Sequence, residues 1–317
     1  MLMNNRARQH LKLPMLLILS ALLLSGCGSS ESNVDSGNRT GTLHWGNGTE
    51  PQSLDPHIAT GVPEHHIITA IMEGLILKDS TTLAPKPGVA EYWTVSDDGR
   101  VYTFNLRKNA RWSNGDPHNA NDYVWSWWRA LQPALGNLYA YMYFSIENAQ
   151  EYYEGAVTDF DQVGVKALDD YTLQVTLSNP TPYFLQLLDH YSLYPVHRGT
   201  VEKFGAADER GTRWTYEGNN VGNGAFKLVD WKINRRITVE RNQYYWNSEK
   251  VQLNKIVFYP TENVVSEERM FRAGQLHRTG SIPADKIPVY LEANDSSLHI
   301  APYLGTYFYR INTRVPH

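Results

Sequence analysis

Cysteine is almost missing from this sequence, since Cys27 is the only one among 317 residues. A single cysteine cannot form an internal disulfide, so the fold has to be stable without that cross-link, even in an oxidising compartment. An excess of positive charge is missing too, because 29 lysines and arginines face 33 aspartates and glutamates and give a net charge of −4. A mildly acidic chain is a poor candidate for binding nucleic acid, and we expect no such partner.

Long hydrophobic runs are also scarce. The run Leu13–Leu24 has about a dozen residues, whereas a transmembrane helix needs about 20. With 42% hydrophobic and 20% charged residues, the composition excludes a membrane protein with many spans. Aromatic residues, in contrast, are plentiful, with 9 tryptophans and 20 tyrosines. Such a surplus is typical of clefts and interfaces, and packing between lobes explains it equally well.

The N-terminus is typical of an export signal. Arg6, Arg8 and Lys12 precede the apolar run. The run ends in Leu24-Ser25-Gly26-Cys27, which is similar to the bacterial lipobox, where a cysteine after small residues becomes lipidated. An ordinary signal peptide with an incidental cysteine is the alternative.

From this pattern we predict a lipoprotein signal peptide over residues 1–26, lipidation of Cys27, and a flexible tether over residues 27–40, which are small and polar. Removal of the signal peptide takes away three cationic side chains and no acid, so the mature net charge becomes −7. Firm anchoring requires more than one acyl chain.

Catalytic motifs are missing. The sequence has no Gly-x-Ser-x-Gly, His-Glu-x-x-His or Ser-x-x-Lys, and its one cysteine is assigned to the lipid. Gly222-Asn223-Gly224 lacks the Lys-Ser/Thr of a phosphate-binding loop and predicts a turn. His57, His65 and His66 are the nearest approach to a metal site, but adjacent histidines on a helix point about 100° apart, so a helix start is favoured. We expect no enzyme, no metal and no cofactor.

Hydrophobic periodicity predicts a mixture of helices and strands without strict alternation, and therefore an α/β or α+β fold. A helix begins near Glu64, and two hairpins are indicated by turn residues between alternating segments. The predicted helices and strands are Thr42–Trp45, Tyr102–Leu106, Asn121–Leu131, Val163–Ala167 with Thr172–Leu177, Ala225–Trp231 with Arg236–Arg241, Lys255–Tyr259, Val264–Ala273, and two extended segments at Leu298–Pro302 and Thr306–Asn312.

Several blocks of the sequence, in order, resemble the bacterial oligopeptide-binding proteins, which are the extracytoplasmic solute-binding receptors (family 5) of peptide ABC importers. The likeness runs over essentially the whole mature chain, and the number of blocks makes it specific. They are Glu50-Pro51-Gln52-Ser53-Leu54-Asp55-Pro56-His57, Gly61-Val62-Pro63-Glu64, Glu73-Gly74-Leu75, Pro87–Trp93, Tyr102–Arg107, Ala110–Pro117, Asp122–Trp127, Val221–Phe226 and Thr306–Asn312.

The resemblance implies a mixed α/β fold of the periplasmic-binding-protein type, class II (cluster C), and a function in capturing oligopeptides for an ABC permease. In this family an extended segment after the Leu-Asp-Pro turn pairs with the main chain of the peptide, and here that segment is Thr60-Gly61-Val62. Backbone pairing suits a receptor that has to ignore sequence, because every peptide offers the same N–H and C=O groups. Gly61 would allow close approach, and Pro63 would stop further pairing within the sheet.

The same resemblance implies further peptide-binding residues, namely Tyr139, Asn223, Phe308 and Arg310. Phe308 and Arg310 share one face of a strand by alternation, so Arg310 would favour acidic peptide side chains if that face meets the ligand. Arg310→Ala should then weaken binding of acidic peptides selectively.

The resemblance also implies how the chain divides. We expect a first ligand-binding lobe made of residues 41–73 and 198–300, an accessory domain over residues 74–197, and the start of a second lobe at residues 301–317. Family members are considerably longer, so most of the second lobe is missing, and we interpret the chain as C-terminally truncated or completed by a companion C-terminal chain. With half a cleft, we expect peptide affinity weaker than millimolar, less than about 4 kcal/mol.

Other functions remain open from sequence alone. Nickel, haem or oligosaccharide are alternative solutes within the family, because fold does not fix the ligand. An exported hydrolase would need a nucleophile or metal that we do not find, and an envelope interaction protein would use the aromatic residues to hold a partner chain. We predict a cell-envelope lipoprotein that faces the periplasm or the outer surface of the cytoplasmic membrane.

Overall fold

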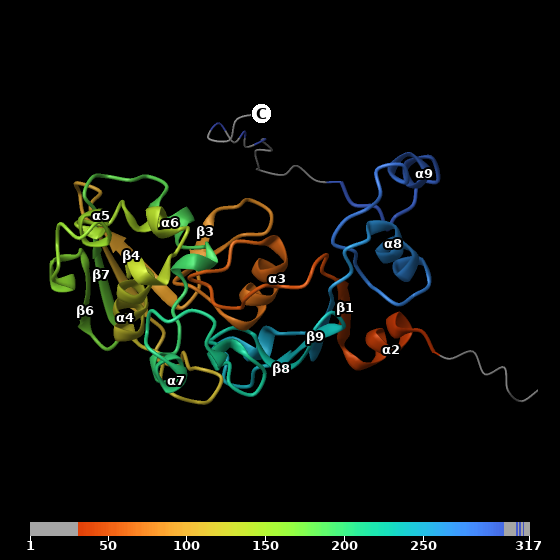
Figure 1. Cartoon of the computed structure of the whole chain (residues 1–317), viewed down its shortest axis with the longest axis horizontal. Coiled ribbons are helices and arrows are strands. Elements are labelled where there is room, and N and C mark those ends of the chain that lie inside the picture. Colours follow the sequence, from red (N-terminus) through yellow and green to blue (C-terminus); the bar gives the residue numbers. More distant parts are fainter. Residues whose placement is uncertain (1–30, 301–308, 310, 312, 314–317) are drawn as a thin grey trace, which may run out of the picture.

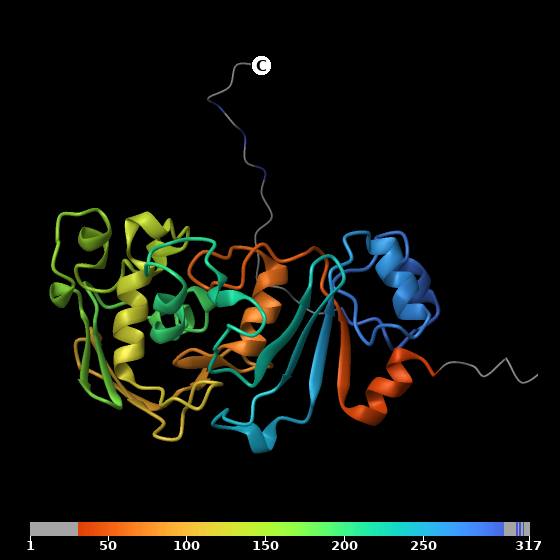
Figure 2. The same ribbon diagram turned by 60° about the horizontal axis from the view of Figure 1, so that its bottom comes forward.

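The structure is a computed structural model that describes residues 31–300, 309, 311 and 313. The strands in this part of the chain form two four-stranded sheets and a short two-stranded one. The molecule is elongated, with α4 to α6 towards one end and α8 and α9 at the other (Figure 1). Helix α3 (Val62–Ile71) lies in the middle, between the two larger sheets (Figure 2).

The first sheet joins distant parts of the chain. Its order is β1-β10-β9-β8, and β1 (Thr42–Gly46) pairs in parallel with β10 (Lys255–Tyr259). β9 (Arg236–Arg241) is antiparallel to β10 and forms a hairpin with β8 (Phe226–Lys232). The hairpin that the sequence predicts here is confirmed.

The second large sheet is antiparallel throughout and comes from the middle of the chain. Its order is β4-β5-β7-β6, and it comprises β4 (Ala90–Val95), β5 (Val101–Leu106), β7 (Thr172–Thr176) and β6 (Val165–Asp169). β6 and β7 form the second predicted hairpin, which is therefore also confirmed. The two-stranded sheet pairs β2 (Ile76–Lys78) with β3 (Pro85–Pro87).

Local signals explain where the longer helices begin and end. Helix α4 begins after Asn119, whose side chain accepts from the backbone of residue 121 while Asp122 bonds back to the cap, a capping box. Helix α8 is followed by Gly274, whose φ of +67° suits glycine and ends the helix. Beyond α3, the described helices are α2 (Asn33–Thr40), α4 (Ala120–Ala130), α5 (Ala149–Tyr153), α6 (Phe184–Leu187), α7 (Arg198–Phe204), α8 (Val264–Arg272) and α9 (Ile287–Glu292), with short 3₁₀ turns at Pro133–Leu135, Ala140–Tyr143, Phe160–Gln162, Tyr191–Leu193, Arg213–Thr215 and Ser248–Lys250. Over residues 31–300, no helix combines the length and the apolar character needed to span a membrane.

Helix α2 differs from the flexible tether that the sequence predicts over residues 27–40. Ser32 caps its start by accepting from the Asp35 N–H at 3.0 Å, and Gly41 closes its end in the left-handed region. The Val34 N–H donates to the Gly274 carbonyl at 2.9 Å, so the helix is docked on the fold. The two caps and this hydrogen bond stabilise a helix in spite of the small, polar composition. The expected flexible tether is therefore wrong for residues 33–40.

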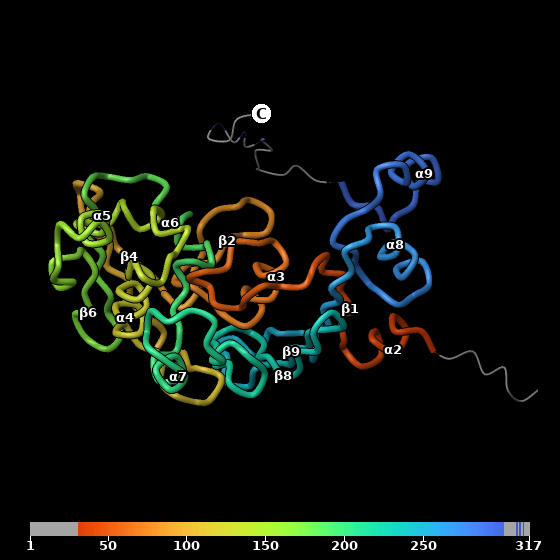
Figure 3. Tube along the Cα trace, viewed as in Figure 1, coloured from red at the N-terminus to blue at the C-terminus, as the bar shows by residue number. Residues whose placement is uncertain are grey.

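The buried side chains gather into two hydrophobic clusters. One lies entirely within residues 75–193 and fills the space around the β4-β5-β7-β6 sheet. The other combines residues 54–72 with residues 191–258 and lies under the β1-β10-β9-β8 sheet. The chain thus leaves the cluster under the β1-β10-β9-β8 sheet at residue 72, builds the separate cluster within residues 75–193, and then returns (Figure 3).

Candidate functional site

The loop before α3 is fixed by a buried ion pair. The guanidinium of Arg129, on α4, is fully buried and donates to both carboxylate oxygens of Asp55, at 2.7 and 3.1 Å. Its Nε donates to the Ala207 carbonyl at 2.6 Å. The Asp55 carboxylate also accepts from the His57 backbone N–H at 3.0 Å, which closes the Asp-Pro-His turn. These contacts hold the start of the loop rigidly against α4.

His57 belongs to this junction rather than to a metal site. Its Nε2 faces the Tyr194 carbonyl at 3.0 Å, and its Nδ1 faces Arg129 at 2.9 Å, so Nε2–H donates and Nδ1 accepts. Burial, with the nearby Arg129 charge, lowers the pKa of His57 to about 4, and the ring is neutral. Within residues 31–300, no group of three metal-ligating side chains comes together, and His65 and His66 lie on α3 as the sequence favours.

The predicted peptide-pairing segment is shorter than expected. Gly61 is extended, at φ −96° and ψ 158°, and caps α3, while Val62 is already the first helical residue. Pro63 therefore stands in the first helical turn, where its fixed φ suits the helix, and it does not terminate a strand. The expectation that Val62 is extended is wrong, because the helix begins at Val62, two residues before the start near Glu64 that the sequence predicts.

The main chain of Thr60 and Gly61 is nevertheless open. No strand pairs with it, and no hydrogen bond between described residues involves either N–H group. Thr60 is exposed and Gly61 partly exposed. Because buried backbone donors are almost always paired, two unpaired donors persist here only where water or a ligand reaches them.

Glycine is needed at position 61 for a reason internal to the protein. A Cβ atom there would collide with the carboxylate of Glu64, which is only 5% exposed and accepts from the Gln52 N–H at 2.7 Å. The expectation that Gly61 permits approach of a ligand remains a prediction. What the structure adds is that the loop folds back tightly on the first turn of α3.

Tyr139 meets this loop from the α4 side of the molecule. Its hydroxyl donates to the Thr60 carbonyl at 3.3 Å, and its ring packs edge-on against His190 and Tyr191, with centroids 4.8 and 6.2 Å away. The structure therefore brings Thr60, Gly61 and Tyr139 together.

Asn223 lies elsewhere and is 3% exposed. Its side-chain oxygen accepts from the Glu73 N–H at 2.9 Å, and its nitrogen donates to the Glu73 carbonyl at 2.8 Å and faces His118 Nδ1 at 3.2 Å. Gly224 follows closely, because a Cβ there would lie 2.5 Å from the Met72 nitrogen. The Asn223 amide joins two backbone segments, and the structure does not place it with Thr60.

Glu73 is itself buried in this second junction. Its carboxylate accepts from the Tyr245 hydroxyl and from Trp246 Nε1, the latter at 2.7 Å. Burial raises the pKa of Glu73 to about 7, although both hydrogen bonds and the Arg107 charge oppose the rise. Arg107 lies over the Trp246 ring at 3.8 Å.

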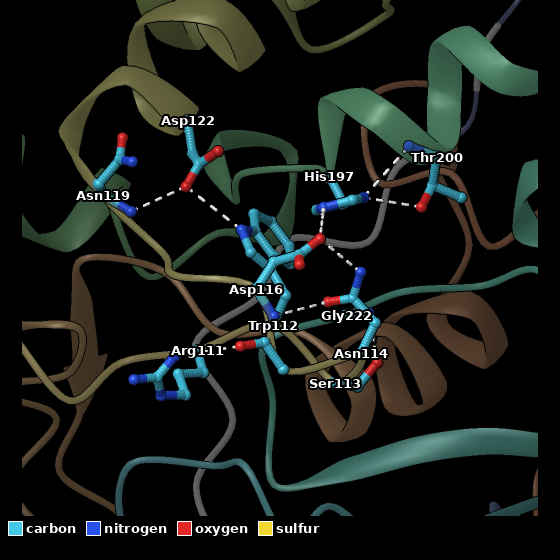
Figure 4. A network of polar contacts seen from close by, with 11 residues as sticks. Arg111, Trp112, Ser113, Asn114, Asp116, Asn119, Asp122, His197, Thr200 and Gly222 are labelled. Carbon is cyan, nitrogen blue, oxygen red and sulfur yellow. Dashed lines mark hydrogen bonds and ion pairs between the residues drawn. The ribbon is translucent and has the colours of Figure 1, made fainter.

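A third polar network connects the loop at residues 111–118 to α4 and α7 (Figure 4). Trp112 Nε1 donates to the Asp122 carboxylate at 3.2 Å, and His197 Nε2 meets the Asp116 carboxylate at 3.0 Å. The Ser113 N–H donates to the Gly222 carbonyl at 2.7 Å. Burial raises the pKa of Asp122 to about 6. These contacts fix the loop at residues 111–118 against the starts of both helices.

A cavity of about 500 Å³ opens beside Thr60 and Gly61. Its walls include aromatic and charged side chains that sequence reasoning did not single out, namely Arg210, Trp214, Tyr216 and Trp231. Glu50 holds one wall, because its carboxylate accepts from Trp231 Nε1 at 2.7 Å and from the Asn234 N–H at 3.0 Å. The surplus of aromatic residues was the one signal that pointed to such a wall.

Comparison with known proteins identifies the family. Residues 84–317 match the middle region of the bacterial extracellular solute-binding proteins, family 5. The chain belongs to this family.

The similar proteins found by sequence and the similar solved structures are of the same kind. The periplasmic oligopeptide-binding protein OppA of Escherichia coli is 42% identical over 280 residues, which are 87% of this chain and 50% of that protein. OppA of Haemophilus influenzae, solved in complex with the peptide RPPGFSPFR, superimposes with a TM-score of 0.75 at 38% identity, over 81% of this chain and 49% of the other. The open, unliganded murein tripeptide-binding protein MppA also gives a TM-score of 0.75, at 34% identity, over 80% and 48%.

The mixed α/β fold expected for a family 5 solute-binding protein is thereby confirmed. The chain spans about half the length of the relatives that it matches. Of the expected functional residues, Cys27, Phe308 and Arg310 lie outside the described residues. The extended segments expected at Leu298–Pro302 and Thr306–Asn312 fall largely outside them too.

Proposed function

We propose that this chain captures oligopeptides along the open main chain of Thr60 and Gly61, as a solute-binding component of a peptide ABC importer. The observation that carries the proposal is the pair of unpaired N–H groups in an exposed, rigidly anchored loop. Relatives named for binding oligopeptides support the same ligand class. None of the relatives named above points to nickel, haem or oligosaccharide, so those alternatives are not favoured.

The physical argument rests on what peptides share. An extended peptide presents alternating N–H and C=O groups whatever its sequence, so pairing with them yields affinity without selecting side chains. Tyr139 stands across the Thr60 carbonyl and bonds it only weakly, at 3.3 Å, so this acceptor is open to exchange with a ligand donor. Thr60, Gly61 and Tyr139 therefore carry the proposed site, and Val62 adds an exposed apolar side chain next to it.

We further propose the division into an accessory domain at residues 74–197 and a first ligand-binding lobe at residues 41–73 and 198–300. The two separate hydrophobic clusters support these boundaries, since their members change over at residues 72–75 and again at residues 191–196. Residues 301–317 are the proposed start of a second lobe, which would carry Phe308 and Arg310.

For its location, we propose an exported lipoprotein, with residues 1–26 as the signal and Cys27 as the lipidated residue. The periplasmic relatives support export. An ABC permease and a membrane surface are then its partners. The polar clusters near the site serve structural roles, so a binder without catalytic turnover is the favoured function.

The proposal is tested by changing peptide backbones while keeping their side chains. Alanine pentapeptides that carry a single N-methyl group, placed at each position in turn, are titrated at millimolar concentration. The protein is the ¹⁵N-labelled chain without the predicted signal peptide, residues 1–26. At the positions that pair, loss of one hydrogen bond should weaken binding about threefold to tenfold. Unmethylated peptides with other uncharged side chains should bind alike.

Shifted resonances of Thr60 and Gly61 would locate the contact. If all N-methylated peptides bind as well as the parent, or if no peptide perturbs these residues, the backbone-pairing proposal is wrong. Intact peptides recovered after long incubation, measured by mass spectrometry, distinguish capture from hydrolysis.

A further inference from the structure

A continuous row of rings runs from the proposed site across α3 to the first sheet. Tyr139 contacts Tyr191, with centroids 6.2 Å apart, and Tyr191 contacts His65 at 5.6 Å. His65 lies 6.0 Å from His66, which lies 4.8 Å from Trp45 on β1. We call these five side chains the aromatic row. It connects Thr60, at one end, with β1 at the other.

The far end of the row is fixed by the backbone. Arg278 forms a parallel bridge with Trp45, and its carbonyl accepts from the Gly46 N–H at 2.8 Å. His66 Nδ1 lies 2.9 Å from the Asn47 side-chain oxygen and therefore carries the proton that it donates. The Asn47 nitrogen donates to the Pro63 carbonyl at 3.1 Å, which ties β1 to the first turn of α3.

Arg278 occupies this end with an uncompensated charge. Its guanidinium lies over the Trp45 ring at 4.3 Å, and the side chain is exposed. No ion pair and no side-chain hydrogen bond to another described residue involves it, whereas the nearby Arg272 has a carboxylate, Glu268, at 3.7 Å. Burial, with the charges of His65 and Arg278, lowers the pKa of His66 to about 4, which makes His66 a sensor of charge at this place.

Two acidic groups near the other end and the middle of the row are already engaged. Asp189, near His65 and His190, is paired with Lys78 at 2.7 Å. Glu64, at the Thr60 end, is buried and accepts a backbone N–H. The row therefore presents neutral rings along its length and one unneutralised cation at its end.

We propose that Arg278 receives a carboxylate of the bound peptide, either an acidic side chain or the C-terminal group, while the accessible rings of the aromatic row contact the intervening residues. Tyr191 is buried and supports these rings from below. This inference rests on the proposed peptide-binding function. An arginine that lies over an indole keeps free the N–H groups that face away from the ring, and a carboxylate can accept two hydrogen bonds from them. The residue thus favours acidic peptides without preventing neutral ones from binding.

The test uses the exported chain and three pentapeptides. Ala-Ala-Glu-Ala-Ala and Ala-Ala-Gln-Ala-Ala, both with amidated C-termini, isolate the side chain, and pentaalanine with a free carboxylate isolates the terminus. Binding and the His66 pKa are followed by NMR. We expect the carboxylate-bearing peptides to bind about threefold to tenfold more tightly than the glutamine peptide and to raise the His66 pKa.

Arg278→Ala should remove this preference, and Arg278→Lys should retain part of it. Arg235→Ala is the matched control, because Arg235 is an exposed arginine at the turn between β8 and β9, away from the row. If the glutamate, glutamine and pentaalanine peptides bind equally, or if Arg278→Ala keeps the preference, the role of Arg278 is refuted while peptide binding stands. If no peptide binds, the proposed function fails as well.

Discussion

The loop that ends at Thr60 contains two regions that treat polar groups in opposite ways. Around Asp55, every polar atom that enters the interior is paired, and Arg129 alone makes four contacts, with Asp55 twice, His57 and the Ala207 carbonyl. Five residues later, the N–H groups of Thr60 and Gly61 have no partner among the described residues. We call the unpaired main chain of Thr60 and Gly61 the open edge, and the paired groups around Asp55 the closed junction. The contrast teaches that the open edge depends on the closed junction, because an unpaired segment keeps its shape only when its neighbours are fixed.

The largest effect should come from breaking the closed junction. Arg129→Ala leaves the Asp55 carboxylate buried without a cation, and we expect the free energy of unfolding to fall by about 3–5 kcal/mol. Urea denaturation followed by fluorescence measures this. Asp55→Ala with Arg129→Ala should cost less than the sum of the single changes, since neither charge is then stranded. Additive losses would show that the pair does not act as a unit.

A pH dependence should separate the second junction from the exposed loop. The pKa of Glu73 is raised by burial from 4.5 to about 7, so the folded state binds its proton more tightly than the unfolded state. Its contribution to stability is full below pH 4.5 and is lost as pH rises through 7, by about 3 kcal/mol.

Glu73→Gln can still accept from Trp246 and donate to the Tyr245 hydroxyl, so its stability should fall less between pH 5 and 8 than that of the parent. Denaturation at several pH values provides the measurement. Parallel pH curves for parent and variant would show that Glu73 does not titrate in this range.

Asn223→Ala sharpens the comparison further. The change leaves the Glu73 N–H and carbonyl buried without partners, and we expect a loss of about 2 kcal/mol. Because its amide is occupied within the protein, peptide titrations at low temperature should be unaffected in the folded fraction. Selective loss of peptide binding with unchanged stability would instead restore Asn223 as a ligand-binding residue.

Tyr139→Phe should have the smallest effect on stability. The lost hydrogen bond is long and partly exposed, so we expect a change of about 0.5 kcal/mol or less by thermal denaturation. Peptide affinity should change more than stability, since the Thr60 carbonyl loses the one side-chain donor that it has among the described residues, while the ring remains. A large drop in melting temperature would show that Tyr139 stabilises the fold, as the residues of the closed junction do, and would contradict its assignment to the open edge.

The structural features that depend on residues close together in the chain were correctly predicted from the sequence. Both hairpins and the helices predicted at Asn121–Leu131 and Val264–Ala273 follow from local chemistry, and the structure has them with slightly different ends. The family blocks pointed to Thr60, Gly61 and Tyr139, which come together.

The contacts that the sequence analysis did not predict join residues that are distant in the chain. Nothing local reveals that Arg129 neutralises Asp55, or that Asn223 bonds Glu73, because these pairs are 74 and 150 residues apart. The helical start of Val62 was missed since Pro63 was interpreted as a strand terminator, although proline is equally at home in a first helical turn. Arg278 was missed because its distinguishing feature is spatial. No described carboxylate pairs with it in the fold, and a sequence does not show which residues are neighbours in space.

The parallel pairing of β1 with β10 has a consequence for the order in which this protein takes shape. A ribosome delivers β1 early, yet its hydrogen-bonding neighbours, β10 and the strand-like stretch at residues 277–278, emerge about 200 residues later. The core within residues 75–193 has all its members by then and can condense first. Strand β1 therefore stays unpaired until these later segments have been made, and this interval is when holdase chaperones have the greatest opportunity to bind it.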